Sequence, residues 1–254
     1  MNRTPFKPAI LAVLIAQMLA SQSQAADTVE LDAQRVTGQL FSQNIAEQAF
    51  AVEVIERADL KLLPVTNLAD ALEWVGGLDV RQRGSGAQVD LGIRGAGYEQ
   101  TLILVDGVRM NDPQTGHHNF DLPVTLEDIE RIEIVRGPGA GQYGPNGNAG
   151  VINLVTRKQV ESENGRSALL KAEAGSKDYA RGLLSLAKTQ GNWSHFAAVS
   201  QQESDTYIKG ADLDYISQQG NYRLVHQNDA HTTVLGLGYL DRGFGAQGSY
   251  AGAD

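Results

Sequence analysis

The stretch that decides the fold is residues 129–156, IERIEIVRGPGAGQYGPNGNAGVINLVT, in which two apolar segments flank a long glycine-rich one. Alternation of apolar and charged side chains over residues 131–136 predicts a strand, and the short β-branched run 151–156 predicts another. The glycines between them predict tight turns, because a residue without Cβ reaches backbone conformations closed to others. We therefore expect two strands joined by an irregular loop.

The middle of this stretch, Gly139–Gly144, matches the G-x-G-x-x-G pattern of dinucleotide-binding enzymes. That pattern works where a helix N-terminus directs its free N–H groups at a pyrophosphate. Here PNGNAG follows at 145–150 and a strand comes next, which disfavours a nucleotide-dependent enzyme. G-x-S-x-G and H-E-x-x-H do not occur either, so we expect no enzyme, no catalytic residue, no cofactor and no metal site.

Upstream of this stretch the sequence predicts a short capped helix. Asn67 followed by Asp70 resembles a capping box, residues 68–75 carry an apolar stripe at helical spacing, and Gly76–Gly77 ends the helix. Further on, residues 102–105 predict a buried strand that turns at Asp106–Gly107 into a hairpin. Thr125 is expected to cap a second short helix. These elements predict a compact α+β domain.

Composition limits the possible functions. The chain has 254 residues, no cysteine and a formal charge of −9, and more than half of its 28 glycines fall between Gly76 and Gly150. A nucleic-acid partner is not expected, because phosphate binding requires clustered Lys and Arg. The absence of cysteine excludes disulfides and thiolate metal sites within these residues.

The first 25 residues predict a secretory signal peptide. Arg3 and Lys7 precede an apolar run at 9–20, and Ser23 and Ala25 place small residues before a cleavage point. The run is too short to span a bilayer as a helix. We therefore expect an exported chain, which is either soluble outside the cytoplasm or a β-type membrane protein.

After Lys158 the pattern changes to weak alternation interrupted by turns. Five strands are predicted, at Ser167–Ala174, Tyr179–Thr189, Trp193–Gln202, Tyr215–Gln227 and His231–Arg242. Segments of about ten residues with aromatic residues near their ends suit an outer-membrane β-barrel. A soluble β-meander fits these residues equally well.

Several blocks, in order, carry a family resemblance: Ile93–Gly95, Leu104–Val108, Ile129–Pro138, Tyr143–Gly144 and Gly150–Thr156. Their succession resembles the plug domain of TonB-dependent outer-membrane receptors. The resemblance covers roughly residues 40 to 158. It implies a plug seated in a barrel of about 22 strands, of which the later strands are the first part of the wall.

The resemblance also implies roles for charged residues of the plug. Arg94 and Arg136 lie on segments that face barrel acids in this family, and we expect them to hold the plug by charge-assisted hydrogen bonds. Glu133 is an expected internal partner. Solvated strand-end arginines are the alternative.

The family carries an N-terminal coupling segment, the TonB box, that pairs as an added strand with a periplasmic energy-coupling protein. By resemblance it consists here of Asp27, Thr28, Val29, Glu30 and Leu31. Glu30 departs from the mostly apolar family pattern, which leaves the register open. A mature N-terminus without function is the alternative.

In this family, outward-facing plug loops help to bind cargo. Two polar loops are candidates here, Gln82–Gln88 and Asn111–Asn119. The candidate ligand-binding residues are Arg83, Ser85, Asn111, Asp112, Gln114, His117, His118 and Asn119. The second loop most resembles cobalamin-type receptors, and an iron siderophore stays open as the cargo.

The expected organisation is a signal peptide at 1–25, a coupling segment at 26–40, a plug at 41–158 and the first, truncated strands of a β-barrel at 159–254. The expected function is active uptake of a bulky small molecule across the outer membrane of a Gram-negative cell. The expected partners are a TonB-type protein, outer-membrane lipid and the cargo. About five strands cannot close a barrel, since the smallest need about 8, so we expect a fragment. The alternative is an exported, soluble plug-like ligand-binding protein.

Overall fold

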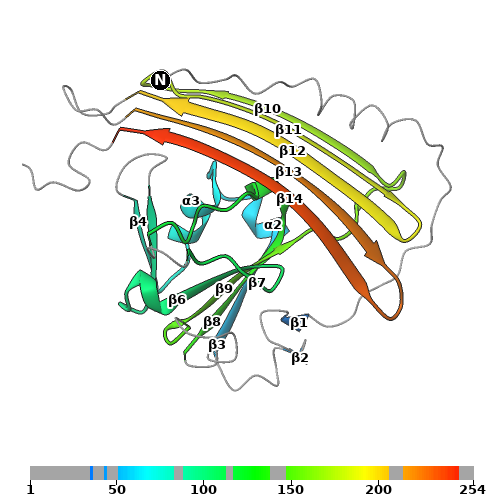
Figure 1. The fold of residues 1–254 in the computed structure, drawn as a ribbon, viewed down its shortest axis with the longest axis horizontal. Coiled ribbons are helices and arrows are strands. Elements are labelled where there is room, and N and C mark those ends of the chain that lie inside the picture. The colour runs from blue at the N-terminus through cyan, green and yellow to red at the C-terminus, as the bar shows by residue number, and fades with distance from the viewer. Residues whose placement is uncertain are drawn as a thin grey trace, which may run out of the picture.

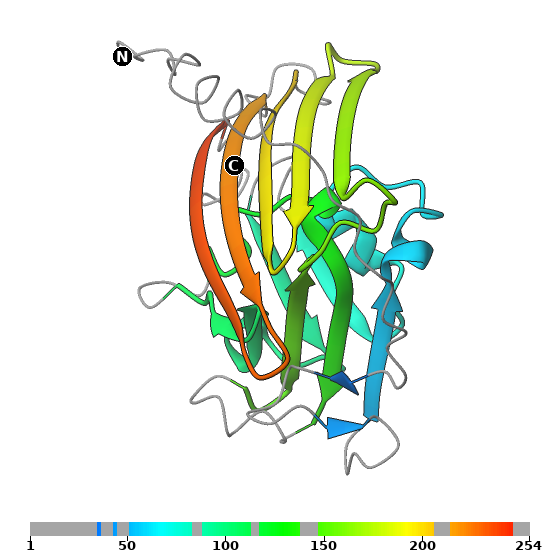
Figure 2. The ribbon, with the colours of Figure 1, turned by 90° about the vertical axis from the view of Figure 1, so that its right-hand side faces the viewer.

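The computed structural model describes residues 35–36, 43–44, 51–82, 88–112, 117–137, 147–205 and 214–245. We call residues 51–158 the N-terminal domain and the five strands β10–β14 the curved sheet. Figure 1 shows the curved sheet arching over the N-terminal domain, which lies on its concave side. Figure 2 shows the same arrangement from the side. The expected α+β domain followed by antiparallel strands is therefore confirmed.

A five-stranded mixed sheet forms the centre of the N-terminal domain, in the order β3-β8-β9-β6-β7. Its strands are β3 (Ala51–Glu56), β6 (Thr101–Val105), β7 (Val108–Arg109), β8 (Ile129–Arg136) and β9 (Gly150–Thr156). The two strands of the opening stretch, β8 and β9, pair antiparallel, and β9 pairs parallel with β6. The expected turn at Asp106–Gly107 joins β6 to β7, with both residues at positive φ.

Short helices and hairpins surround this sheet. They are α2 (Arg57–Leu60), α3 (Leu68–Glu73), the hairpin β4 (Leu78–Gln82) with β5 (Val89–Ile93), the 3-10 helices η2 (Tyr98–Gln100) and η3 (Leu126–Asp128), and the pair β1 (Arg35–Val36) with β2 (Gln43–Asn44). The expected caps form: the Asn67 side chain accepts from the Asp70 N–H at 2.9 Å, and Thr125 caps η3. Among the described residues no helix is long and apolar enough to cross a membrane.

The core of the N-terminal domain lies between α3 and one face of its sheet. Leu72 of α3 is fully buried and packs in one cluster with Ile93, Ile134 and Ile152. Each such side chain contributes about 1.5–3 kcal/mol by leaving water. A smaller cluster covers the other face of the sheet. The domain thus has its own hydrophobic core.

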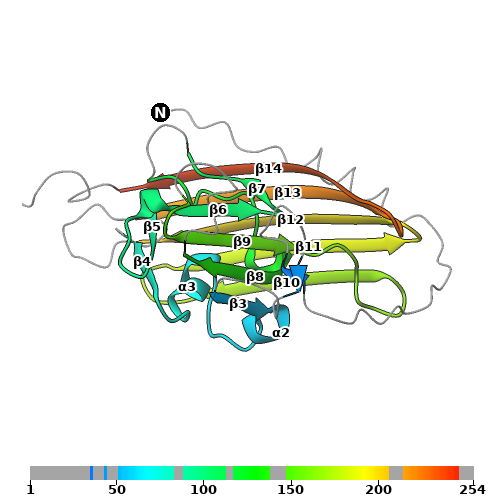
Figure 3. The same cartoon turned by 90° about the horizontal axis from the view of Figure 1, so that it is seen from below.

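The curved sheet consists of β10 (Arg166–Ala174), β11 (Ala180–Gln190), β12 (Trp193–Ser204), β13 (Tyr215–Gln227) and β14 (Thr232–Phe244), antiparallel and in chain order. All five expected strands are present, with ends that differ by one or two residues. Short connections at 191–192 and 228–231 join strands at one end. Toward the opposite end, where β14 finishes, lie β4 and β5 (Figures 1 and 3).

The two faces of the curved sheet differ in an unusual way. Polar side chains such as Arg181, Asn221 and Arg223 are buried on the concave face. On the convex face Leu235 and Leu237 are 58% and 65% exposed. A soluble sheet would show the reverse pattern, whereas a barrel wall turns apolar residues to lipid and polar residues inward. This distribution favours a membrane wall over the soluble meander.

Candidate functional site

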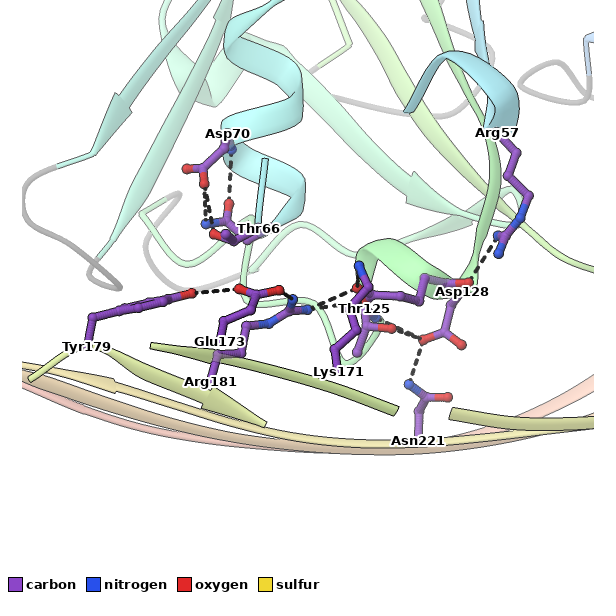
Figure 4. Close-up of polar contacts among 12 residues, drawn as sticks. Arg57, Thr66, Asp70, Thr125, Asp128, Lys171, Glu173, Tyr179, Arg181 and Asn221 are labelled. Carbon is purple, nitrogen blue, oxygen red and sulfur yellow. Dashed lines mark hydrogen bonds and ion pairs between the residues drawn. The ribbon is translucent and has the colours of Figure 1, made fainter. Parts of the chain in front are cut away.

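Residues 121–128 of the N-terminal domain face the curved sheet, and we call them the docking segment. Its end is fixed locally by a capping box, in which the Asp128 carboxylate accepts from the N–H and hydroxyl of Thr125 at 2.9 and 2.8 Å. From the opposite side, Arg57 donates to the carbonyl oxygens of Glu127 and Ile129 at 3.0 and 2.7 Å. These contacts aim the segment at the sheet, and Figure 4 shows the Asp128 carboxylate reaching Asn221 of the sheet.

Glu127 forms the first contact across the interface. Arg181 of β11 donates to both of its carboxylate oxygens, at 3.1 and 3.3 Å, and Lys171 of β10 donates at 2.9 Å. Arg181 also donates to Glu173 at 3.0 Å. Burial alone would raise the pKa of Glu127, but the nearby Arg181 and Lys171 outweigh it, and the pKa lies below its usual value. The carboxylate is therefore held ionised.

Asp128 forms the second contact. Asn221 of β13 donates to its Oδ2 at 2.8 Å, and the Nη2 of Arg223 lies 3.5 Å from its Oδ1. Arg223 also donates to the carbonyl oxygen of Arg157 at 3.1 Å. The guanidinium groups of Arg157 and Arg223 both lie against the Phe196 ring, 5.2 and 4.8 Å from its centroid, a cation–π geometry.

The start of the docking segment is held by β13 and β14. Arg242 pairs with Asp121 at 2.8 Å, and Gln219 donates to the carbonyl oxygen of Leu122 at 3.0 Å. Pro123 fits against Gly238, where an added Cβ would overlap the proline ring. Glycine is required at 238 by close approach of the two parts.

A cavity of about 240 Å³ lies beside these contacts. Its lining comes from both parts of the molecule and is largely polar. It includes Asp70 and Gln82 from the N-terminal domain and Gln202, Ser217 and Gln219 from the curved sheet. The interface is therefore not close-packed along its whole length.

Asp106 fixes the point at which the chain leaves the N-terminal domain. Its carboxylate accepts from the Thr156 N–H at 2.9 Å, from the Thr156 hydroxyl and from Lys158 Nζ at 2.6 Å. Burial, only partly offset by Asp106, lowers the pKa of Lys158. The turn predicted at 106–107 thus also anchors the connection to the first wall strand.

The expected ligand loops lie partly within the described residues. His117 is stacked on Tyr98, with ring centroids 4.5 Å apart, and contacts Asp90 at 3.1 Å. His118 contacts Asp121 at 2.9 Å. Both imidazoles are partly exposed, so a ligand could reach them. Arg83, Ser85 and Gln114 lie outside the described residues.

The asparagines of the second loop face inward. Asn111 is buried and accepts from the Ile103 N–H at 2.9 Å while donating to the Thr101 carbonyl oxygen at 3.1 Å. Asn119 is also buried and accepts from the Asp112 N–H at 2.9 Å. These contacts give both asparagines a structural role in shaping the loop. Ligand binding by any of the expected residues stays a prediction.

The expected lock residues have partners inside the N-terminal domain. Arg136 binds Glu53 and the Gly76 carbonyl oxygen, and Glu133 binds Arg131 and Asn153. Arg94 is exposed, at positive φ, in the turn after β5. Their contact with barrel acids stays a prediction. The expected signal peptide and the coupling residues 27–31 lie outside the described residues.

Sequence analysis missed the docking segment. Glu127 and Arg181 are 54 residues apart, and nothing local connects them. The sequence contained one sign of buried charges on these strands. Arg181 shares a strand face with Leu183 and Ser185, and Arg223 shares a face with Val225. An arginine on the same strand face as such residues indicates a buried charge, which requires a partner.

Comparison with known proteins agrees with this geometry. Residues 44–151 match the family model of the TonB-dependent Receptor Plug Domain. The Vitamin B12 transporter BtuB of Vibrio vulnificus is 35% identical over 175 residues, covering 66% of this chain and 27% of that protein. The iron-regulated outer membrane virulence protein of Vibrio cholerae is 36% identical over 177 residues, with the same coverage of both. The chain thus spans 27% of the length of these curated relatives.

Solved structures share the fold. The siderophore receptor PirA from Pseudomonas aeruginosa superposes with a TM-score of 0.54 at 26% identity, covering 78% of this chain and 36% of that one. PirA from Acinetobacter baumannii gives a TM-score of 0.59 at 24% identity, covering 76% and 32%. The relative from Vibrio vulnificus is named a transporter, both PirA proteins are named receptors, and the relative from Vibrio cholerae is named a virulence protein.

Proposed function

We propose that this chain is part of an outer-membrane receptor that takes up a bulky nutrient by TonB-dependent transport, because residues 44–151 match the family model of the TonB-dependent Receptor Plug Domain. The observation that carries the proposal is the docking of this domain on the polar concave face of a sheet whose convex face is apolar. A wall built this way faces lipid on one side and a plugged lumen on the other. Its location is then the outer membrane of a Gram-negative cell.

The cargo class follows from the relatives. Their names mention vitamin B12 and siderophores, and both are large ligands rich in polar groups. The half-exposed His117 on Tyr98 offers such a cargo a flat surface with hydrogen-bonding edges. We assign the loops Gln82–Gln88 and Asn111–Asn119 to cargo binding, and residues 27–31 to pairing with a TonB-type protein after removal of residues 1–25.

Transport requires the plug to be retained at rest and displaced under load. We assign Arg94 and Arg136 to contacts with barrel acids. Replacing both with alanine should raise leakage of small solutes through the receptor. Unchanged permeability would count against that role.

The test of the proposed function is a cargo titration. The receptor is extracted with detergent from outer membranes of cells that encode it, then titrated with cyanocobalamin and with ferric siderophores. Saturable binding of one class is expected. A protein recovered without detergent in the soluble periplasmic fraction would contradict the proposal and support the soluble binding protein.

A further inference from the structure

One row of side chains across the curved sheet contains three basic residues. Arg166, Lys188 and His195 are direct neighbours in the register of β10, β11 and β12. The row continues through Leu224 of β13 to Leu235 of β14. Residues directly opposite each other in antiparallel strands share a face of the sheet, and Leu235 lies on the convex face. The three basic side chains therefore lie on the face that is turned away from the N-terminal domain.

This basic row lies near one end of the sheet. Arg166 is the first residue of β10, and Lys188 and His195 lie on either side of the short connection 191–192, at the right of Figure 1. In outer-membrane barrels the short turns face the periplasm and the longer loops face outward. Leu235 lies three residues inside β14, so the row runs from the rim of the sheet toward its apolar part. We therefore expect the basic row at the periplasmic boundary of the membrane.

Charge is separated along the convex face. Among the described strand residues, the acidic side chains of this face are Glu203 and Asp241, both near the opposite end of the sheet. Arg166 and Lys188 stand directly opposite each other, and like charges in that position repel. A ligand that brings negative charge to the basic row relieves this repulsion.

Aromatic side chains lie on both sides of the basic row. Trp193 is 48% exposed and stacks on His226 in the row nearer the turn, with ring centroids 4.4 Å apart. In the row on the other side, the Tyr222 hydroxyl lies 2.8 Å from Nδ1 of His195. Trp and Tyr suit the membrane–water boundary because each has an apolar body and a polar edge. Farther along the face Leu170 is 78% exposed, so apolar surface follows the basic row directly.

We propose that the basic row binds the phosphate of an anionic phospholipid in the periplasmic leaflet of the outer membrane. Arg166 and Lys188 donate to the phosphate oxygens, and Nε2 of His195 supplies a further hydrogen bond. The acyl chains lie over the apolar residues farther along the face. Preference over a zwitterionic lipid comes from the net negative charge of the headgroup. The inference rests on the membrane location given under the proposed function and not on the cargo.

Native mass spectrometry of the detergent-purified receptor tests this site, with phosphatidylglycerol as the probe and phosphatidylcholine as the reference lipid. The wild type should bind phosphatidylglycerol more tightly. The double variant R166Q/K188Q should weaken that binding at least about tenfold, because each cation near a lipid headgroup adds to the attraction. Binding of phosphatidylcholine should stay the same. Equal affinity of the wild type for the two lipids would overturn the proposal.

The variant K177Q is the matched control. Lys177 is an exposed cation in the connection 175–179, at the opposite end of the sheet, so K177Q should bind phosphatidylglycerol as the wild type does. An equal loss in K177Q and R166Q/K188Q would show that binding follows total charge, and it would contradict a site at the basic row.

Cargo binding checks that the double variant is folded. R166Q/K188Q should still bind cyanocobalamin or ferric siderophore, because the basic row lies away from the N-terminal domain. If the double variant fails to fold, the wild type in rising salt decides, since screening should remove the preference for phosphatidylglycerol. A preference that high salt leaves intact would contradict the proposal. A wild type that prefers phosphatidylglycerol but binds neither cargo would contradict the proposed function alone.

Discussion

Glu127 and Glu130 lie three positions apart, yet their surroundings shift the pKa of the two carboxyls in opposite directions. Burial raises the pKa of Glu130, with a smaller contribution from Glu161. Burial also raises the pKa of Glu127, but the nearby charges of Arg181 and Lys171 lower it by more, so that this pKa lies below its usual value. One carboxylate is therefore stabilised in its charged form by the curved sheet, and the other is disfavoured when charged.

This difference predicts a pH-dependent effect of E127Q. Near pH 7 the variant should lower the free energy of unfolding of the N-terminal domain by about 3 kcal/mol, the range for breaking a buried ion pair. An acid whose folded pKa is lowered stabilises above its unfolded pKa, here 4.5, and that contribution is lost as the pH falls through the folded pKa. Calorimetry of the detergent-solubilised receptor should show that the difference in free energy of unfolding between wild type and E127Q becomes smaller below pH 4.5.

The variant E130Q is the matched control, and it should not share the loss of stability expected for E127Q. E130Q removes a charge that burial disfavours, so it should leave the stability near pH 7 unchanged or raise it. The stability difference between wild type and E127Q should begin to shrink once the pH falls below the unfolded pKa of 4.5, because the folded pKa of Glu127 is lowered. A difference that persists undiminished at about pH 3 would therefore show that Glu127 acts through packing and not through its charge.

Gly238 and Gly236 of β14 differ in how closely they approach the docking segment. Gly238 and Gly236 lie on the same face of the strand, but a Cβ at 238 would overlap Pro123, whereas at 236 its nearest neighbour is the Arg223 side chain at 3.9 Å. G238A should therefore destabilise docking by about 1–3 kcal/mol through overpacking, and G236A should have little effect. The rate of limited proteolysis of the N-terminal domain measures docking in G238A and in G236A, and it should rise only in G238A. Equal protease sensitivity would contradict this close fit.

Elements with local signals were predictable from sequence. The cap at Asn67, the turn at Asp106–Gly107 and the five strands after Lys158 all follow from short-range patterns. Strand β3 and the hairpin β4–β5 were missed, because their stability comes from pairing with β8 and from packing under α3. Burial in the middle of a sheet also removed the alternation expected for β8.

The site was less predictable than the fold. Asn111 and Asn119 are polar loop residues in the sequence, but folding turns them inward to bind backbone groups. Glu127 meets Arg181 only because the curved sheet folds back over the domain (Figure 1). Such contacts between distant segments leave no periodic pattern. The inward-facing arginines of β11 and β13 were the available sign.

For the molecule as a whole, the apolar convex face should determine where the protein resides. Leu235 is 58% exposed on that face. If the face contacts lipid, L235R should cost about 2–4 kcal/mol near the bilayer midplane and reduce assembly into outer membranes. D229R, in the exposed turn 228–231, is the control and should assemble normally. Normal amounts of L235R in the outer-membrane fraction would argue against a lipid-facing wall.

The central claim is that the chain belongs to a receptor whose transport depends on energy delivered through its N-terminal segment. The most direct measurement is uptake of radiolabelled cyanocobalamin and ferric siderophore by cells that encode the protein, with and without an uncoupler, and with the variant V29P. Proline at 29 removes a backbone donor from the expected added strand. We predict retained surface binding but loss of uptake in both the uncoupled cells and the variant. Uptake that continues in either case would contradict the account.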